Sequence, residues 1–206
     1  MSQITTGIRA CLNLPALYTA FQYAMGARSG WTYLARTHIR ARPGDAILDI
    51  GCGPADILGY LPPVKYWGFD IDPGYIDSAR RRFGENGTFT CKELSPADVA
   101  GLEPFDIVLA TGVLHHMDDA VATGLLSTAR AALKPGGRLV TIDPVFADGQ
   151  SRIARLLIEN DRGQNVRTKE GYEQLMRRRF DDVRVLVRHR RWIPYTHCIM
   201  EATATP

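Results

Sequence analysis

The sequence predicts an α/β fold with a doubly wound sheet of about seven strands, mostly parallel but with an antiparallel strand at the C-terminus. Short apolar runs alternate with helical patterns from residue 46 onward, which is typical of a parallel sheet covered by helices. Turns rich in glycine and proline separate these runs, and the chain ends in two alternating runs. Apolar residues at helical spacing before residue 43 predict N-terminal helices.

Length and composition indicate a single soluble domain, since the chain has 206 residues, 45% hydrophobic content and a formal net charge of +3. No stretch approaches the ~18 apolar residues of a membrane span, and no apolar core follows a basic start, so we expect neither a span nor a signal peptide. The four cysteines, Cys11, Cys52, Cys91 and Cys198, form no CxxC pair. We therefore expect no zinc site, no disulfide framework and a reducing, cytoplasmic location.

The N-terminal part contains two apolar stripes at helical spacing. The first stripe follows Pro15, a favoured residue at a helix start, and consists of Leu14, Leu17, Phe21 and Met25. The second stripe consists of Trp31, Leu34, Ala35 and Ile39. Two or three helices are predicted before the first strand.

Five strands are predicted in the first three quarters of the chain, at residues 46–50, 65–70, 88–91, 105–110 and 138–142. Asp72 and Pro73 predict the start of a helix after the second strand, whose buried stripe is Ile76, Ala79 and Phe83. The helix after the fourth strand is expected to bury Val121, Leu125, Ala129 and Leu133, and to stop at residues 134–137.

The C-terminal runs predict an antiparallel pair of strands. In the first run, Val183, Val185 and Val187 alternate with arginines, and in the second the alternating residues are Ile193, Tyr195, His197 and Ile199. Proline cannot donate a ladder hydrogen bond, so the last strand should begin pairing only after Pro194.

The turn after the first strand, Gly51-Cys52-Gly53, resembles a turn that binds an adenosine ligand. Glycine lets the backbone approach a ligand closely, and the following helix offers free amide groups. Asp70 ends the second strand 21 residues after Asp49, near the spacing of about 20 at which an acidic side chain meets a ribose. The alternatives are a tight connection without a ligand, and a role for Asp70 as a helix cap.

Four segments together resemble the successive motifs of class I S-adenosylmethionine-dependent methyltransferases, in particular the bacterial small-molecule group. These are ILDIGCGPADIL, GFDIDPGYI, FDIVLATGVLHHMDD and LKPGGRLVTID, which span residues 46–143 in the family's order. The resemblance implies a Rossmann-like fold, with a helical lid or cap at 1–42, a cofactor-binding core at 43–143 and acceptor-side helices with the terminal strand pair at 144–206. Ala55 departs from the pattern, since many members have a third glycine there; a single methyl group should be tolerated.

The resemblance also implies S-adenosylmethionine as cofactor, S-adenosylhomocysteine as product, and a role for each motif. The methionine part is placed in the turn formed by Asp49, Gly51, Cys52 and Gly53. The ribose is assigned to Asp70 and Ile71, and the adenine to Glu93 and Leu94. The sulfonium is assigned to the end of the fourth strand, at Ala110, Thr111 and Val113.

Methyl transfer is an in-line displacement, so alignment does most of the work and a general base is optional. His115 and His116 follow a strand end at the edge of the sheet where ligands bind, and an imidazole titrates near neutral pH. Asp143 ends the fifth strand at the same edge and is a third catalytic candidate, although Asp143-Pro144 is also a turn signal. Alternatively, one histidine packs beneath the cofactor and the other caps the helix that begins near Asp118.

A catalytic metal is not predicted. A magnesium site at Asp118, Asp119 and Asp143 is the alternative, but carboxylates beside helix starts are usually caps.

The acceptor is expected to be a small polar molecule, sugar-like or amine-like, methylated on oxygen or nitrogen. Residues 150–168 join the fifth strand to the terminal pair, and their polar centre includes Arg162 and Asn165. Tyr18 and Tyr23 could contribute from a helical lid. The alternatives are a solvated loop and core aromatic residues.

Three other functions remain as rivals. A nicotinamide-dependent oxidoreductase predicts a third glycine and a Tyr-x-x-x-Lys pair, and the sequence has neither. A non-catalytic, adenosine-binding regulatory protein is the second rival. Nucleic-acid methylation is the third; the arginines at 177–179, 188, 190 and 191 could form a basic patch, but Ala110-Thr111-Gly112-Val113 replaces the tetrad of base-amino methyltransferases. We expect no nucleic-acid or membrane partner, and a monomer or homodimer.

Overall fold

The central sheet is doubly wound, as predicted. The computed structural model describes residues 27–160, 163–190 and 195–205. Strands follow the order β3-β2-β1-β4-β5-β8-β7, and the short β6 pairs with β5. The pairs among β1 to β5 are parallel, whereas β8 runs antiparallel to both β5 and β7. The strands are β1 Ala46–Ile50, β2 Lys65–Asp70, β3 Thr88–Cys91, β4 Phe105–Thr111, β5 Leu133–Phe146, β6 Arg167–Thr168, β7 Asp182–Arg190 and β8 Tyr195–Thr203.

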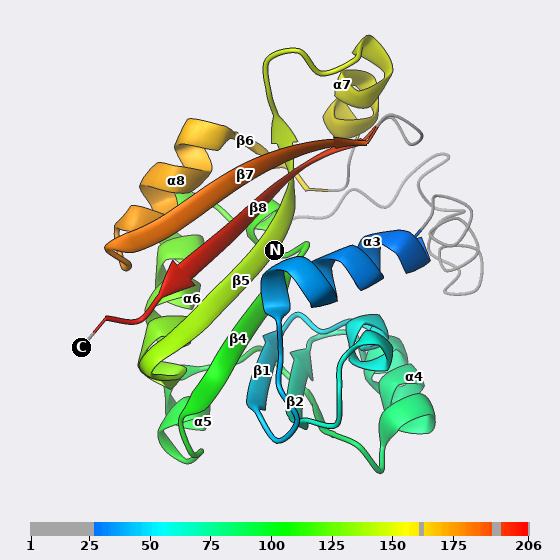
Figure 1. Cartoon of the computed structure of the whole chain (residues 1–206), viewed down its shortest axis with the longest axis vertical. Coiled ribbons are helices and arrows are strands. Elements are labelled where there is room, and N and C mark those ends of the chain that lie inside the picture. The colour runs from blue at the N-terminus through cyan, green and yellow to red at the C-terminus, as the bar shows by residue number, and fades with distance from the viewer. Residues whose placement is uncertain (1–26, 161–162, 191–194, 206) are drawn as a thin grey trace.

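Helices cover both faces of the sheet (Figure 1). One apolar cluster is contributed by the sheet together with α5, α6 and α8, and the other by the sheet with η1, η2 and α4. The helical elements are α3 Ala27–Tyr33, η1 Leu34–Ile39, η2 Asp56–Tyr60, α4 Pro73–Phe83, α5 Pro96–Ala100, η3 Leu114–His116, α6 Asp119–Ala132, α7 Arg152–Glu159 and α8 Lys169–Arg177. None of the helices in the described residues is long and apolar enough to cross a membrane.

Several element boundaries were predicted correctly from local signals in the sequence. Asp72 caps α4 by accepting from the backbone of Gly74 and Tyr75, and Ile76 and Ala79, which belong to this helix, are fully buried. In α3 and η1, Leu34, Ala35 and Ile39 are buried as expected, and Trp31 is half-buried. The first apolar stripe, Leu14, Leu17, Phe21 and Met25, lies outside the described residues.

The terminal strand pair also follows the prediction. β8 begins at Tyr195, whose partner in β7 is Arg190, so the described pairing starts after Pro194. Val183, Val185 and Val187 pack partly buried against the core, while the exposed positions between them include Arg184. The alternation of apolar and basic residues thus reflects one buried face.

The predicted helix stop is confirmed to within two residues, because α6 ends at Ala132, but the predicted start of the next strand at residue 138 was wrong, because β5 begins at Leu133. The ladder with β4 contains a register shift between Phe105 and Ile107, which accommodates the glycines. Gly136 has a positive φ of 78° and its N–H donates to Ala204 over 2.8 Å, while the N–H of Ala204 donates to Gly137. The glycines therefore form an irregular strand start that pairs with the chain beyond β8.

The face of α6 that packs on the sheet differs from the predicted face by a rotation of about one residue. Val121 is 46% exposed, whereas Ala122, Leu126 and Ala129 are fully buried. Small alanine side chains let the helix backbone approach the sheet closely, so the face containing two alanines is the one that packs. Leu133 is buried as predicted, but it belongs to β5.

A partly buried ionic cluster ties η1 to β8. The carboxylate of Glu201 accepts from His38 Nδ1 at 2.7 Å and from Arg40, while Arg138 donates to the carbonyl of His38 at 3.0 Å. Burial by itself raises the pKa of Glu201, but the hydrogen bonds from Arg40 and His38 outweigh it and leave the pKa below its ordinary value of 4.5. The cluster fixes the helix before β1 to the neighbouring strands β5 and β8.

Glu201→Gln is expected to lower the free energy of unfolding by about 2 kcal/mol at pH 7, because it leaves His38, Arg40 and Arg138, whose Nη1 lies 3.8 Å from the carboxylate, without their anion. Since the pKa of Glu201 is lowered on folding, its contribution is present above pH 4.5 and is lost as pH falls through the folded value. Urea unfolding at several pH values measures this difference. Glu173→Gln, which removes an exposed pair with Arg177, is the control and should cost less than about 0.5 kcal/mol. Equal losses for the two variants would contradict a structural role for the cluster.

Candidate functional site

The candidate site lies where the carboxyl ends of adjacent parallel strands meet. The order of the strands reverses at β1, which has β2 on one side and β4 on the other. Ligands bind in such sheets outside the carboxyl ends of the strands at the reversal point. The glycine turn follows β1, the two histidines follow β4, and Asp70 and Asp143 come from β2 and β5.

The glycine turn is held against β2 and leaves space on its outer side. The N–H groups of Gly51 and Cys52 both donate to the carbonyl of Phe69, at 2.8 and 3.0 Å. Gly51 has a positive φ of 68°, and a Cβ there would lie 2.6 Å from Val113 Cγ2. Gly53 has a φ of 53°, but a Cβ there would meet nothing within 4 Å. Gly51 therefore permits close packing against the chain after β4, whereas Gly53 faces open space.

Ala55 occupies the position of the missing third glycine and shows what glycine would contribute there. It is fully buried and has a left-handed backbone with a φ of 57°. That conformation costs a non-glycine residue about 1 kcal/mol. The methyl group is accommodated, as predicted, at a conformational cost.

Asp70 braces the glycine turn. Its carboxylate accepts from the N–H of Gly53 at 2.8 Å and from the N–H of Asp72 at 2.9 Å. Partial burial raises its pKa, and these backbone hydrogen bonds limit the increase. The alternative that Asp70 caps the next helix is not supported, because Asp72 performs that role. Ile71 is half-exposed next to it.

Asp49 is a buried carboxylate with one oxygen satisfied. Tyr66 donates its hydroxyl to Asp49 Oδ2, and Asp49 Oδ1 has no hydrogen-bond partner among the described residues. Burial raises the pKa of Asp49 to about 7; the Tyr66 hydrogen bond opposes the increase and the charge of Asp70 adds to it. A buried carboxylate oxygen without a donor indicates a missing partner.

The remaining predicted cofactor residues come from three strand ends. Cys52 is buried, and burial raises the pKa of its thiol. Glu93 is exposed after β3, and Leu94 is half-buried against the apolar core. At the end of β4, Ala110 is fully buried, Thr111 is half-buried and Val113 packs against the glycine turn.

His115 and Asp143 form a buried pair. His115 Nδ1 lies 2.8 Å from Asp143 Oδ1, and the backbone N–H of His115 donates to the same oxygen at 3.2 Å. The side chain of His115 is 7% exposed, and that of Asp143 is inaccessible. The ring of His116 stacks obliquely on that of His115, with centroids 4.0 Å apart. Asp118 caps α6 by accepting from the backbone of Ala120 and Val121, so the prediction that one of the histidines caps this helix was wrong.

The magnesium alternative is not supported by the geometry. Asp118 caps α6, Asp119 pairs with Arg167 and Arg178, and Asp143 pairs with His115. Within the described ranges no group of three or more His, Cys, Asp or Glu side chains is placed to hold a metal ion.

Part of the segment 150–168 lies directly on His115. The N–H of Asn165 donates to the carbonyl of His115 at 2.9 Å. A Cβ at Gly163 would lie 2.0 Å from His115 Cδ2, so the close approach requires glycine. Of the predicted acceptor residues, Asn165 is thus brought to the histidines, whereas Tyr18, Tyr23 and Arg162 lie outside the described residues.

Two residues of the site were missed in the sequence. Arg167 donates to the carbonyls of Leu114 and Met117, at 2.9 and 2.7 Å, and so clamps both ends of the turn that carries the histidines. Tyr66, the second, binds Asp49. A polar tip in a strand predicted to be buried implies a buried partner, which was the available signal for Tyr66; no local signal identified Arg167.

The arginines at 177–179 are engaged within the chain. Arg177 pairs with Glu173, Arg178 with Asp119, and Arg179 donates to Ser127 at 2.5 Å. Arg188 stacks on the ring of Tyr33. These four arginines therefore take part in contacts within the chain.

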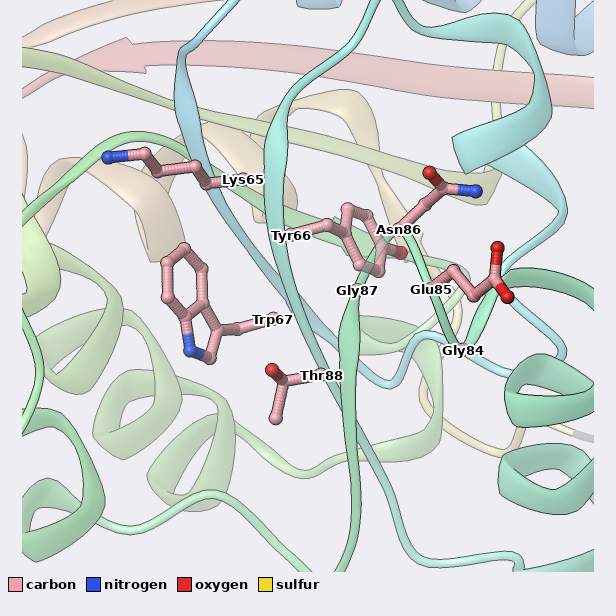
Figure 2. Close-up of a pocket in the computed structure, with 8 residues that line it drawn as sticks. All are labelled: Lys65, Tyr66, Trp67, Gly84, Glu85, Asn86, Gly87 and Thr88. Atoms are coloured by element: carbon pink, nitrogen blue, oxygen red, sulfur yellow. The ribbon is translucent and has the colours of Figure 1, made fainter.

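A separate shallow pocket of about 300 Å³ lies at the opposite edge of the sheet (Figure 2). It is lined by Lys65, Tyr66 and Trp67 at the amino end of β2 and by residues 84–88 before and at the start of β3. The glycine turn and the histidines lie at the carboxyl ends of the strands, so this pocket is not part of the candidate site.

Comparison with known proteins matches part of the chain to a methyltransferase domain and to parts of longer proteins. Residues 48–139 match the family model described as a methyltransferase domain. An uncharacterised 37.1 kDa protein of a transposon from Streptomyces fradiae is 38% identical over 111 residues, covering 50% of this chain and 31% of that protein. Lovastatin diketide synthase of Aspergillus terreus is 33% identical over 124 residues, covering 53% of this chain and 5% of the synthase. The alignments thus cover less than a third of either relative.

The fold is shared with solved structures. The apo form of SibL, an S-adenosylmethionine-dependent methyltransferase, superposes with a TM-score of 0.72 at 19% identity, covering 100% of this chain and 63% of SibL. The likeness at this identity concerns the fold.

Proposed function

We infer that this chain, which belongs to the class I S-adenosylmethionine-dependent methyltransferases, transfers a methyl group from S-adenosylmethionine to an oxygen or nitrogen atom of a small polar acceptor. The observation that carries the reaction is the buried His115–Asp143 pair at the same strand edge as the glycine turn. The imidazole of this pair can accept a proton, and it lies at the same strand edge as a turn suited to an adenosine cofactor.

The residues of the turn fit this cofactor. The open space beside Gly53 admits a ligand close to the backbone, and the unsatisfied Oδ1 of Asp49 suits the ammonium group of the methionine part. Asp70 would hold the ribose, with Ile71 beside it, and the adenine would lie near Glu93 and Leu94. Ala110, Thr111 and Val113 would border the sulfonium, beside Gly51 and Cys52. When bound, S-adenosylmethionine supplies an electrophilic methyl group on a good leaving group.

The protein's part in the reaction is to align the acceptor and take its proton. Asp143 accepts the Nδ1 proton of His115, which selects the tautomer in which Nε2 is the basic nitrogen. The same carboxylate stabilises the imidazolium that forms when Nε2 takes a proton. Arg167 keeps the histidine turn in place through the carbonyls of Leu114 and Met117. His116, stacked on His115, and Asn165 would border the acceptor.

Carbon is a second candidate for the methylated atom. The similarity to lovastatin diketide synthase favours an acceptor of the diketide type. The carbon between two carbonyl groups is acidic, and a base that removes its proton makes it a nucleophile. A buried His–Asp pair suits that step as well as deprotonation of a hydroxyl.

The experiment is transfer of labelled methyl from S-adenosylmethionine to a panel of sugars, amines, hydroxylated aromatics and diketide thioesters. We expect label in one acceptor class containing hydroxyl or amine groups, with S-adenosylhomocysteine formed in equal amount. Label confined to the diketides would establish carbon in place of oxygen or nitrogen. If S-adenosylmethionine neither binds nor loses its methyl group, the proposed function is wrong.

A further inference from the structure

A tyrosine inside the sheet holds the carboxylate beneath the glycine turn. Tyr66 is 2% exposed and Asp49 is fully buried, and the hydroxyl of Tyr66 donates to Asp49 Oδ2. We propose that Tyr66 is a positioning residue of the cofactor site, which fixes the Asp49 carboxylate so that Oδ1 accepts from the ammonium group of S-adenosylmethionine or S-adenosylhomocysteine. This inference rests on the proposed cofactor.

The packing of β1 and β2 makes the contact possible. In the ladder Ile47 is opposite Tyr66 and Asp49 is opposite Gly68, so Tyr66 lies two positions before Asp49 and its side chain is on the same face. Gly68 leaves that face free of a side chain at the next position. A Cβ at Gly68 would lie 2.8 Å from Cys52 Sγ and 3.0 Å from Phe89 Cδ1. Glycine therefore makes room for the close packing around the pair.

The charges around the pair explain why Asp49 needs a cation from outside. The titratable groups that act on Asp49 or Tyr66 are Cys52 from the turn, Asp70 from the end of β2 and Asp56 from η2. None of these groups is cationic. A phenol satisfies one carboxylate oxygen with a neutral hydrogen bond, and the other oxygen remains for a positively charged ligand.

This arrangement couples cofactor binding to the ionisation of Asp49. Burial raises the pKa of Asp49 to about 7, so at pH 6 much of the free protein carries a neutral Asp49. An ammonium ligand binds the ionised form, and its affinity therefore falls as pH decreases. Tyr66→Phe removes the donor that stabilises the ionised form, so the pKa of Asp49 should rise further.

The test is titration calorimetry with S-adenosylhomocysteine between roughly pH 6 and pH 8.5. The free carboxylate beside its α-amino group raises the pKa of that group above the range of about 7.7–8.0 for a peptide N-terminus, so the group stays largely protonated. We expect the wild-type affinity to fall about tenfold from pH 8.5 to pH 6. Because the pKa of Asp49 should rise further in Tyr66→Phe, this variant should bind about tenfold more weakly than wild type at pH 6 and within about twofold at pH 8.5. This convergence at high pH separates positioning of a charge from general damage to the site.

Three controls define the result. 5′-Methylthioadenosine lacks the ammonium group, so its affinity should depend little on pH and be equal for wild type and Tyr66→Phe. Tyr60→Phe removes a hydroxyl from the same apolar cluster without touching Asp49 and should bind S-adenosylhomocysteine as wild type does. Asp49→Asn cannot ionise, so its affinity should be weak and nearly independent of pH.

The outcomes distinguish this inference from the proposed function. If wild type binds S-adenosylhomocysteine but Tyr66→Phe binds equally well, or is weakened by the same factor at every pH, Tyr66 is not a positioning residue and the methyltransferase assignment stands. A pH-dependent affinity in Asp49→Asn would also overturn the inference. If wild type binds neither S-adenosylmethionine nor S-adenosylhomocysteine, the proposed function itself fails.

Discussion

Replacing His115 by alanine is expected to lower the rate of methyl transfer by about 10²- to 10⁴-fold, the contribution typical of a general base. The affinity for S-adenosylhomocysteine should change by less than about twofold, because His115 pairs with Asp143 and is not among the residues assigned to the cofactor. Asp143 orients His115 over 2.8 Å, so Asp143→Asn should also reduce the rate. Single-turnover transfer to the acceptor found with the labelled panel, together with calorimetry, measures both quantities.

His116→Ala is the matched control for the His115 prediction. Its ring stacks on that of His115, whereas the contacts with Asp143 Oδ1 come from the ring and the backbone N–H of His115. We expect a smaller loss of rate for this variant than for His115→Ala. An unchanged rate in both histidine variants would remove general-base catalysis from the mechanism and leave alignment alone.

Asp70→Ala should lower the affinity for S-adenosylmethionine and S-adenosylhomocysteine by at least about a hundredfold, equivalent to about 2.7 kcal/mol. The carboxylate would accept charge-assisted hydrogen bonds from the ribose, and it already braces the turn through the N–H of Gly53 at 2.8 Å. Both contributions disappear with the side chain. Titration calorimetry with each nucleoside measures the loss.

Asp72→Ala provides the comparison, since Asp72 is two residues away but caps α4. It should cost about 1 kcal/mol of stability and leave cofactor affinity nearly unchanged. If the Asp70 and Asp72 variants bind the cofactor with equal affinity, Asp70 does not hold the ribose.

The fold was largely predictable because its determinants are local. The strand after Asp45, the cap at Asp72 and the glycine turn each depend on a few neighbouring residues, and their order matched a known set of motifs. The face of α6 and the length of β5 depended on packing between distant elements. For α6, Val121 and Ala122 are both apolar, and only the sheet decides which one is buried.

The site was predictable in its residue types but not in its contacts. His115 was a candidate because it follows a strand, and Asp143 because it was predicted to end one, yet their pairing joins residues 28 apart through the β4–β5 register. Tyr66 reaches Asp49 only because β1 and β2 pair as they do, with glycine opposite Asp49. Arg167 acts on carbonyl groups, whose position no side-chain pattern reveals.

The central claim, that the site at the glycine turn binds S-adenosylmethionine, is tested most directly by titrating the protein with S-adenosylmethionine, S-adenosylhomocysteine and NAD. The turn has Ala55 in place of a third glycine, Asp49 offers a carboxylate oxygen to an ammonium group, and the chain matches a methyltransferase domain. We expect saturable binding of the two sulfur nucleosides and none of NAD. Tight binding of NAD, with no binding of either sulfur nucleoside, would contradict the account.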